Sequence, residues 1–192
     1  MTKPGLKLLL AGSLLTLAFT GAHATEVSQV TRQVSALNQQ MDQLNQQTIK
    51  LKQQNALNAK SNSGVYLLPG SKTPAQLKSQ LGMLQLSLTN VTADANGTRA
   101  TLNIRGDSSG PLPAFTAQVV WGQILGTTDN YEEVNPLTLP VSAPESLLVP
   151  SDVAIPLHMP GIQPNQLGFI RIHDIQPSDP NWRPGPRSPF SQ

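Results

Sequence analysis

A serine, two histidines and a few carboxylates are the residues of this chain that could support catalysis. The serine is Ser108, in a Gly-Asp-Ser-Ser-Gly segment at 106–110 that matches the G-x-S-x-G pattern of serine hydrolases. In that pattern the serine lies on a sharp turn from a strand into a helix, beside oxyanion donors. Here Pro-Leu-Pro follows at 111–113, so no helix can begin where one is required. The segment is predicted to be a polar turn between strands.

The histidines do not complete a catalytic group. Outside the first 24 residues they are His158 and His173, and both follow Ser108, whereas trypsin-like proteases place the histidine before the serine. His173 precedes Asp174 on a predicted strand, where adjacent side chains point to opposite faces, so the two are not expected to form an orienting pair. We predict no catalytic residues, and a hydrolase using Ser108 with a downstream histidine is kept as an alternative.

Metal and cofactor sites are not predicted either. No spacing of His, Asp or Glu matches a metal-binding motif. Asp-Ala-Asn-Gly at 94–97 begins like a calcium loop, but the glutamate that completes such a loop is missing. Cysteine is absent, which excludes disulfides, thiolate metal sites and a cysteine nucleophile.

The first 24 residues have the features of a signal peptide. Lys3 and Lys7 precede an apolar segment at 8–19, and Ala22 and Ala24 form an A-x-A cleavage site. The apolar segment is shorter than the ~20 residues that span a bilayer. We therefore expect export to the periplasm, cleavage after Ala24 and no stable membrane insertion afterwards.

Composition argues against nucleic acid and sugar ligands. The chain has 13 basic and 11 acidic residues, and removal of Lys3 and Lys7 with the signal leaves 11 of each, without clustered bases. No nucleic-acid partner is therefore predicted. Aromatic residues make up only 4% of the chain, which leaves no evident stacking platform. A peptidoglycan- or sugar-binding module is kept as a second alternative.

Residues 25–60 are predicted to form a glutamine-rich helix with a coiled-coil seam. Seven apolar residues at alternating spacings of three and four form one stripe: Val27, Val30, Val34, Leu37, Met41, Leu44 and Leu51. The stripe becomes polar at Thr48, Asn55 and Asn58, and its flanking positions hold mainly Gln and Asn instead of charges. Because such a helix is marginal alone, the stripe must pack on something. Self-association, folding back on the globular domain and pairing with another protein's helix are all possible.

Residues 61–82 are predicted to be a linker with a short helix. Lys-Ser-Asn-Ser-Gly at 60–64 interrupts the heptad pattern. Thr73 is a candidate N-cap, Pro74 follows at the first helical position, Gln76 occupies the third, and Gly82 is a candidate stop. These signals predict a helix over 74–81.

The remaining chain is predicted to be mainly β. Short strands are expected at 65–68, 84–88, 100–104, 115–125, 134–141, 153–157 and 167–175, from alternating apolar residues separated by Gly- and Pro-rich turns. An Asn-Gly pair at 96–97 predicts a hairpin, and Trp121 is the expected core aromatic. We predict an antiparallel β-sandwich of the immunoglobulin-like type over 83–176.

The C-terminal residues 177–192 are predicted to be a disordered tail because they contain many prolines. Trp182 and Phe190 are the residues that would matter if this tail docked on the domain.

Five segments resemble the YajI-like family of enterobacterial envelope lipoproteins. They are Asn-Gln-Gln-Met-Asp-Gln-Leu at 38–44, Gly-Val-Tyr-Leu-Leu-Pro at 64–69, Ser-Lys-Thr-Pro-Ala at 71–75, Pro-Leu-Pro-Ala-Phe at 111–115 and Gly-Phe-Ile-Arg-Ile-His-Asp-Ile-Gln-Pro at 168–177. The resemblance covers residues 27–177 and implies a Gram-negative periplasmic protein with a helical N-terminus and a small β-rich domain. It implies no activity, so it transfers no catalytic residues.

This chain departs from the family in two ways. Members of the family carry a lipid-bearing cysteine after the signal, and this chain has none, so membrane anchoring is not expected. The proline-rich extension beyond Pro177 is also additional. Together these features predict an exported, non-enzymatic structural or protein-interaction protein of the cell envelope, with a protein partner or a second copy bound through the helix.

Overall fold

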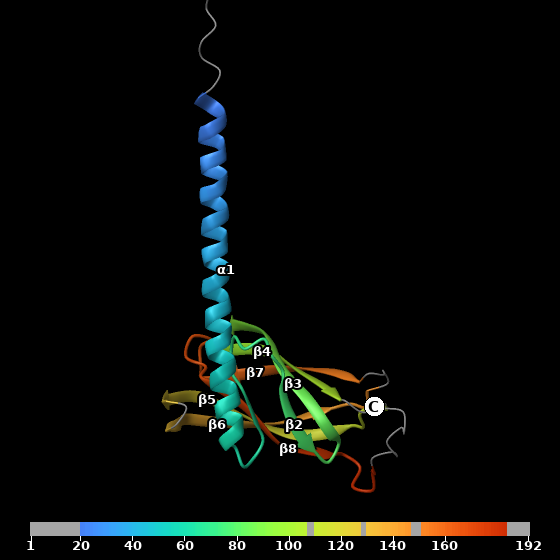
Figure 1. Ribbon diagram of the computed structural model, residues 1–192. Coiled ribbons are helices and arrows are strands. Elements are labelled where there is room, and N and C mark those ends of the chain that lie inside the picture. The colour runs from blue at the N-terminus through green and yellow to red at the C-terminus, as the bar shows by residue number, and fades with distance from the viewer. Residues whose placement is uncertain (1–19, 107–109, 128–129, 147–150, 184–192) are drawn as a thin grey trace, which may run out of the picture. The chain divides into compact units, whose positions relative to one another are not determined.

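A computed structural model of the chain describes residues 20–106, 110–127, 130–146 and 151–183, and side chains from residue 28 onward. In these ranges the chain forms one helix and eight strands (Figure 1). They are α1 (Thr20–Lys60), β1 (Val65–Leu67), β2 (Ala75–Ser79), β3 (Gly82–Asp94), β4 (Gly97–Gly106), β5 (Phe115–Gly126), β6 (Tyr131–Ala143), β7 (Asp152–Pro160) and β8 (Phe169–Pro177). Ser108, Phe190 and most of the predicted signal lie outside the described residues.

The strands form two antiparallel sheets of four. Sheet A has the order β1-β8-β5-β6, and sheet B has the order β2-β3-β4-β7. The chain is therefore mainly β with one N-terminal helix, as the sequence predicted. In an immunoglobulin sheet the second and fifth strands are neighbours, whereas β2, β3 and β4 here follow one another directly. The immunoglobulin-like part of the prediction is thus not confirmed.

One hydrophobic core joins the two sheets in a sandwich-like arrangement. Alternating residues of β3 and β4, such as Leu86 and Ile104, are fully buried and lie opposite each other in register. Val119 and Ile172 pair in the same way in sheet A and belong to the same buried cluster. Trp121 is also buried in this core, as predicted. Period-two alternation therefore located the core correctly.

The chain divides into two compact units, residues 1–43 and 44–192. In the first unit α1 runs from Thr20, so the helix begins earlier than the predicted residue 25. The side chains of α1 from residue 28 to residue 43 are all exposed. No helix in the part of the chain that the structure describes is long and apolar enough to cross a membrane.

In the second unit the C-terminal part of α1 packs on sheet A. Leu57 is 2% exposed and belongs to a cluster with Tyr66, Leu68, Val120 and Phe169. This part of α1 thus packs on the domain through Leu57, which is not a residue of the predicted stripe.

Two amide side chains of α1 bond to backbone groups of β1, the edge strand of sheet A, and of the residues that follow it. The Asn58 amide donates to the carbonyl of Tyr66 (3.0 Å) and accepts from its N–H (2.6 Å). Gln54, only 1% exposed, accepts from the N–H of Leu68 (3.0 Å) and donates to the carbonyl of Thr73 (3.1 Å). Backbone groups that would otherwise be unpaired at this edge thus receive hydrogen bonds from the helix.

The predicted helix at 74–81 is wrong, because residues 75–79 form strand β2. Ala75 and Leu77 lie opposite Leu86 and Leu84 of β3, and the alternate residues Gln76 and Lys78 are exposed. Cap-type residues at 73–76 are a local signal. Pairing with a long neighbouring strand outweighs it, since tertiary contacts routinely override propensity.

The predicted disorder of the tail is also wrong for its first residues. The N–H of Ser178 donates to the carbonyl of Ala114, and Trp182 packs against the core. A large aromatic ring gains enough by burial to order the few residues that lead to it.

The β3–β4 hairpin is confirmed, but its glycine has a different role. Asp94 pairs with Gly97 across a turn at 95–96, and Gly97 has no positive φ. A Cβ at this position would collide with the carbonyl oxygen of Met159 on β7. Gly97 is therefore required by the close approach of a neighbouring strand.

We predict that Gln54→Leu destabilises the protein by about 1–3 kcal/mol for each backbone group that it leaves unpaired, since leucine fills similar space without a hydrogen bond. Urea unfolding followed by circular dichroism measures this loss. Gln46→Leu is the matched control, because Gln46 is exposed on the same helix. Equal stability of the two variants would contradict a structural role for the Gln54 amide.

Candidate functional site

His158 lies on β7 beside the β3–β4 hairpin. Its Nδ1 is 2.9 Å from the Asp94 carboxylate, which also accepts a hydrogen bond from Arg99 at 3.1 Å. The N–H of Ala95 is the largest cause that holds the pKa of Asp94 below its usual value, and Arg99 and His158 act in the same direction. More than half of each basic side chain is exposed. Asp94, Arg99 and His158 therefore form a charged cluster at the end of the hairpin, in contact with solvent.

His173 and Asp174 do form a pair, contrary to the prediction. The Nδ1 of His173 is 2.9 Å from the Asp174 carboxylate. The pairing of β8 with β5 shifts register here, and Asp174 has a positive φ of 52°. A β-bulge of this kind re-aims a side chain, so adjacent residues no longer point to opposite faces. The predicted geometry assumed a regular strand.

Metal ligands are not assembled in the described parts of the chain. No group of three or more His, Asp or Glu side chains comes together there. Each histidine of the domain has one carboxylate beside it.

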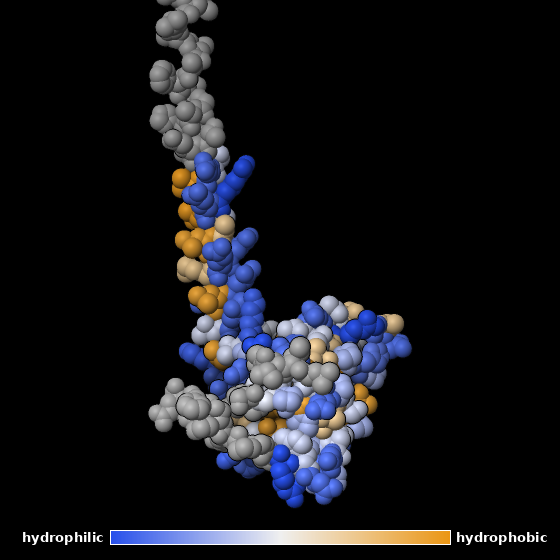
Figure 2. Space-filling model, turned by 90° about the vertical axis from the view of Figure 1, so that its right-hand side faces the viewer, coloured by the Kyte–Doolittle hydropathy of each residue, from blue (hydrophilic) through white to orange (hydrophobic). Residues whose placement is uncertain are grey.

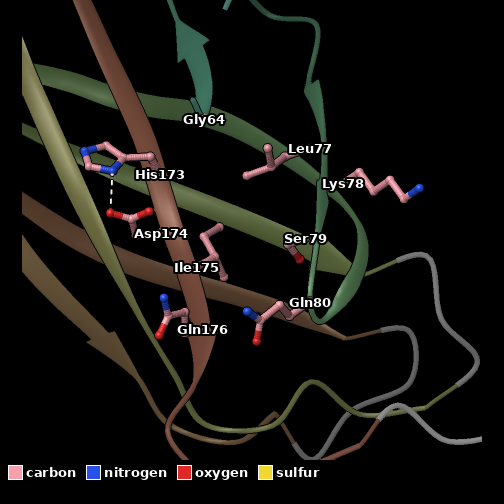
Figure 3. A pocket seen from close by; sticks show the side chains of 9 residues that line it. All are labelled: Gly64, Leu77, Lys78, Ser79, Gln80, His173, Asp174, Ile175 and Gln176. Carbon is pink, nitrogen blue, oxygen red and sulfur yellow. Dashed lines mark hydrogen bonds and ion pairs between the residues drawn. The ribbon is translucent and has the colours of Figure 1, made fainter. Parts of the chain in front are cut away.

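The His173–Asp174 pair lies on the wall of a shallow groove with a volume of about 490 Å³. One wall is β8, residues 173–176, and the other is the end of β2 with its turn, residues 77–80; Gly64 completes the lining (Figure 3). Leu77 and Ile175 contribute apolar surface, and the other lining side chains are polar. This groove can hold a ligand by shape and hydrogen bonds.

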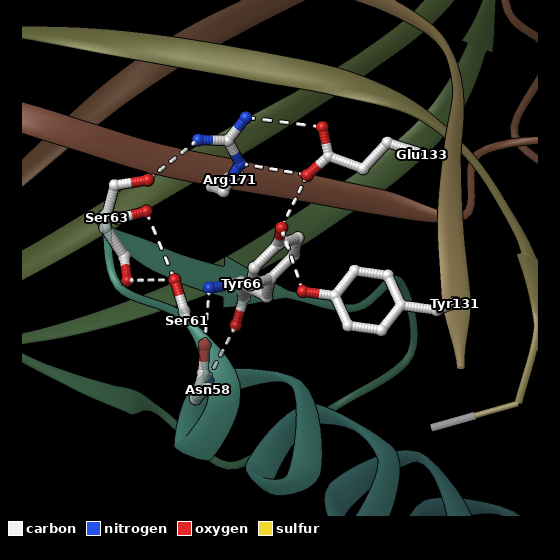
Figure 4. Close-up of polar contacts among 8 residues, drawn as sticks. Asn58, Ser61, Ser63, Tyr66, Tyr131, Glu133 and Arg171 are labelled. Atoms are coloured by element: carbon white, nitrogen blue, oxygen red, sulfur yellow. Dashed lines mark hydrogen bonds and ion pairs between the residues drawn. The ribbon is translucent and has the colours of Figure 1, made fainter. Parts of the chain in front are cut away.

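A second polar group lies on the outer face of sheet A, where the end of α1 meets β1 (Figure 4). Arg171 on β8 makes two hydrogen bonds to Glu133 on β6, at 3.0 and 3.3 Å. Tyr66 on β1 donates its hydroxyl proton to the same carboxylate, and its ring lies 5.7 Å from the Arg171 guanidinium. Three strands are thus joined through one carboxylate.

Burial and the hydrogen bond to Glu133, in that order, raise the pKa of Tyr66 far above its ordinary value. The hydroxyl therefore remains protonated at any physiological pH and acts as a donor, with no role as a base. The arrangement stabilises the meeting of three strands and does not resemble an acid–base pair tuned near neutrality.

The predicted coiled-coil seam falls on exposed side chains wherever α1 is described in the first unit. Val30, Val34, Leu37 and Met41 are 51–57% exposed, and Leu44 is 63% exposed. Figure 2 shows these hydrophobic side chains along one side of the helix. Leu51 is half-buried, and the side chain of Val27 is not described.

Sequence reasoning missed the residues that attach α1 to the sheet. Gln54 belongs to a long run of amides, and Asn58 was noted only as a polar residue of the stripe, so neither indicated a bond to the sheet. Tyr66, Glu133 and Arg171 are distant in sequence, and only the strand order brings them together. Arg171 between two isoleucines on a buried strand was the one available signal.

Comparisons with known proteins place the chain beside uncharacterised lipoproteins. Residues 21–181 match a family described as "protein of unknown function (DUF3251)". The chain is 58% identical over 171 residues to the uncharacterized lipoprotein YajI of Escherichia coli strain K12, covering 89% of this chain and 95% of that protein. The predicted resemblance to YajI-like proteins is thus confirmed, and no enzymatic activity appears in these names.

A solved structure of a relative has a matching fold. The solution NMR structure of YajI from Escherichia coli is similar with a TM-score of 0.67 at 60% identity, over 69% of this chain and 79% of that chain. The trimeric lipoprotein SadB of Salmonella enterica gives a TM-score of only 0.48 at 14% identity, over 80% of this chain and 78% of that chain.

The raised pKa of Tyr66 predicts a pH dependence of stability. Because the folded state holds this proton more tightly, the stabilisation is fully present below the unfolded tyrosine pKa, about 10. It is lost as pH rises from there toward the folded pKa. We expect the free energy of unfolding to fall more steeply between pH 9 and 11 in the unmodified protein than in Tyr66→Phe. Urea unfolding at each pH measures both slopes, and identical slopes would contradict a raised pKa of Tyr66 in the folded protein.

Proposed function

We propose a function for this chain, which belongs to the DUF3251 family of proteins of unknown function. In our proposal it is a non-enzymatic interaction protein of the bacterial cell envelope, and it self-associates through α1. The signal-like residues 1–24 and the description of its relative as a lipoprotein support export to the periplasm. In this proposal α1 brings copies together, and the β-rich unit presents a binding surface.

The exposed apolar stripe of α1 carries the proposal. Five large apolar side chains, at residues 30, 34, 37, 41 and 44, are each more than half exposed. They recur at spacings of four, three, four and three, which is the pattern that buries one side of a helix in a coiled coil. Exposed apolar surface in a continuous row marks an interaction site more strongly than scattered exposed residues do.

A second copy of the same chain is the partner that this seam fits best. The g positions beside it, Gln33, Gln40 and Gln47, carry no charge, so two identical helices meet without repulsion. The a positions begin with Val27 and Val34, and the d positions after Val30 hold Leu, a pattern that leans toward two strands in a parallel coil.

The seam ends near Leu44. The next d position, Leu51, is half-buried, and Asn58 at the following one is bonded to β1. The self-associating part is therefore roughly residues 27–44, about two and a half heptads. A coil of this length is marginal, so we expect weak and concentration-dependent association.

We predict that Leu37→Asp disrupts self-association, because a charge in the middle of the seam loses its hydration when two helices pack. Sedimentation equilibrium of the chain from Thr25 measures the dissociation constant, which we expect to rise at least tenfold.

Gln39→Asp is the matched control, since residue 39 lies at the f position, opposite the seam, and receives the same charge. It should leave the dissociation constant within about twofold. A monomeric unmodified chain at high concentration, or equal effects of the two variants, would overturn self-association through this stripe.

A further inference from the structure

The edge strands of the two sheets, β1, β6, β2 and β7, are not equally protected against pairing with another chain. An edge strand presents unpaired N–H and C=O groups that can pair with another chain. At β6 the edge carries Pro136 and Pro140, and at β7 it carries Pro156 and Pro160. A proline in a paired edge strand has its nitrogen on the outer side, where it removes a donor.

The β1 edge is covered by hydrogen bonds. Asn58 and Gln54 bond to the outward groups of Tyr66 and Leu68, as described above. The Ser61 hydroxyl donates to the carbonyl of Gly64 at 3.0 Å. Three of the four edges therefore have an identifiable protection against pairing.

The β2 edge has neither device. The strand contains no proline. In the hairpin of β2 and β3, Ser79 lies opposite Gly82 at the turn, and this pair fixes which residues of β2 direct their backbone groups toward β3 and which direct them away. By this alternation the N–H and C=O groups of Gln76 and Lys78 point away from β3. Among the described residues, no other segment donates to them or accepts from them.

The unprotected edge borders the groove of Figure 3. The opposite wall of the groove is the part of β8 that follows Ile172, the last residue of β8 that pairs with β1. Gly64, with a φ of 79°, turns the chain away there, so β1 does not extend along residues 173–176. The groove is thus a gap beside an open strand edge. Leu77 is its accessible apolar side chain, because Ile175 on the other wall is only 5% exposed.

We propose that this groove binds an extended peptide segment of a partner protein, which adds to sheet B as a strand beside β2. Main-chain hydrogen bonds to Lys78 in the groove and to Gln76 next to it on β2 supply the pairing, and an apolar side chain of the peptide packs against Leu77. This mode of recognition, β-strand addition, uses the backbone for affinity and alternate side chains for specificity. The site uses none of the residues of the α1 seam and goes beyond the proposed self-association.

Charge defines the peptide further. Lys78 is exposed on the β2 wall, and no carboxylate of the described residues forms an ion pair with it. On the other wall the Asp174 carboxylate is bonded to His173. A peptide with an acidic residue directed at Lys78 therefore fits the groove better than a basic one.

The test uses a phage-displayed library of random ten-residue peptides, selected on the full-length protein. Selected peptides are synthesised with a fluorophore, and their affinities are measured by anisotropy. We expect an alternating apolar pattern with an acidic residue. Gln76→Pro should weaken binding at least tenfold, because it removes one outward N–H as the prolines of β6 and β7 do. Gln76→Ala, which retains the N–H, should bind within twofold of the unmodified protein.

Amide hydrogen exchange on the unmodified protein gives a second readout that does not depend on folding of the proline variant. The bound peptide should slow exchange at the amides of Gln76 and Lys78. Unchanged exchange at these two amides, equal affinities for Gln76→Pro and Gln76→Ala, or a library without any enriched peptide would each overturn the proposal.

Discussion

The structure depends on the hydrogen bonds that two amide side chains of α1 make to the backbone of β1 and of the residues that follow it. A carboxamide offers one acceptor and two donors, so it can pair with a backbone much as another strand would. Asn58 does this with both the N–H and the carbonyl of Tyr66. With β1 held in this way, the ring of Tyr66 lies against Phe169 and its hydroxyl reaches Glu133. The helix end, the edge of sheet A and the polar group on its outer face are thereby one connected unit.

Much of this fold could be predicted from local patterns, because burial of one sheet face produces period-two alternation. The strands around Leu86, Ile104 and Val119 and the β3–β4 hairpin follow from that rule. Two features could not. β2 carries stronger helix signals than strand signals, and only its neighbour β3 decides the outcome. The His173–Asp174 pair arises from a bulge, which depends on the register of β5 against β8.

The candidate binding surfaces were predictable to different degrees. The α1 stripe is visible in the sequence because heptad spacing is a regular signal. Its weakening after Leu44 was also visible, because the stripe becomes polar at Thr48. The attachment of the helix to the sheet was not, since the Gln54 and Asn58 amides carry no signal of their backbone partners and Leu57 lies off the stripe. The groove beside β2 was missed altogether, because it exists only where β1 stops and β8 continues.

The short connection between α1 and β1 has a mechanical consequence. The hydrogen bonds of Asn58 and Gln54 connect α1 to β1 and to the residues that follow β1. They are a second connection between the helix and the sheet, beside the main chain of residues 61–64. A pull or twist applied to this part of the helix therefore reaches sheet A through side-chain amides as well as through the main chain. The joint behaves as a stiff coupling under small loads. It becomes a flexible connection only when these hydrogen bonds and the packing of Leu57 are both lost.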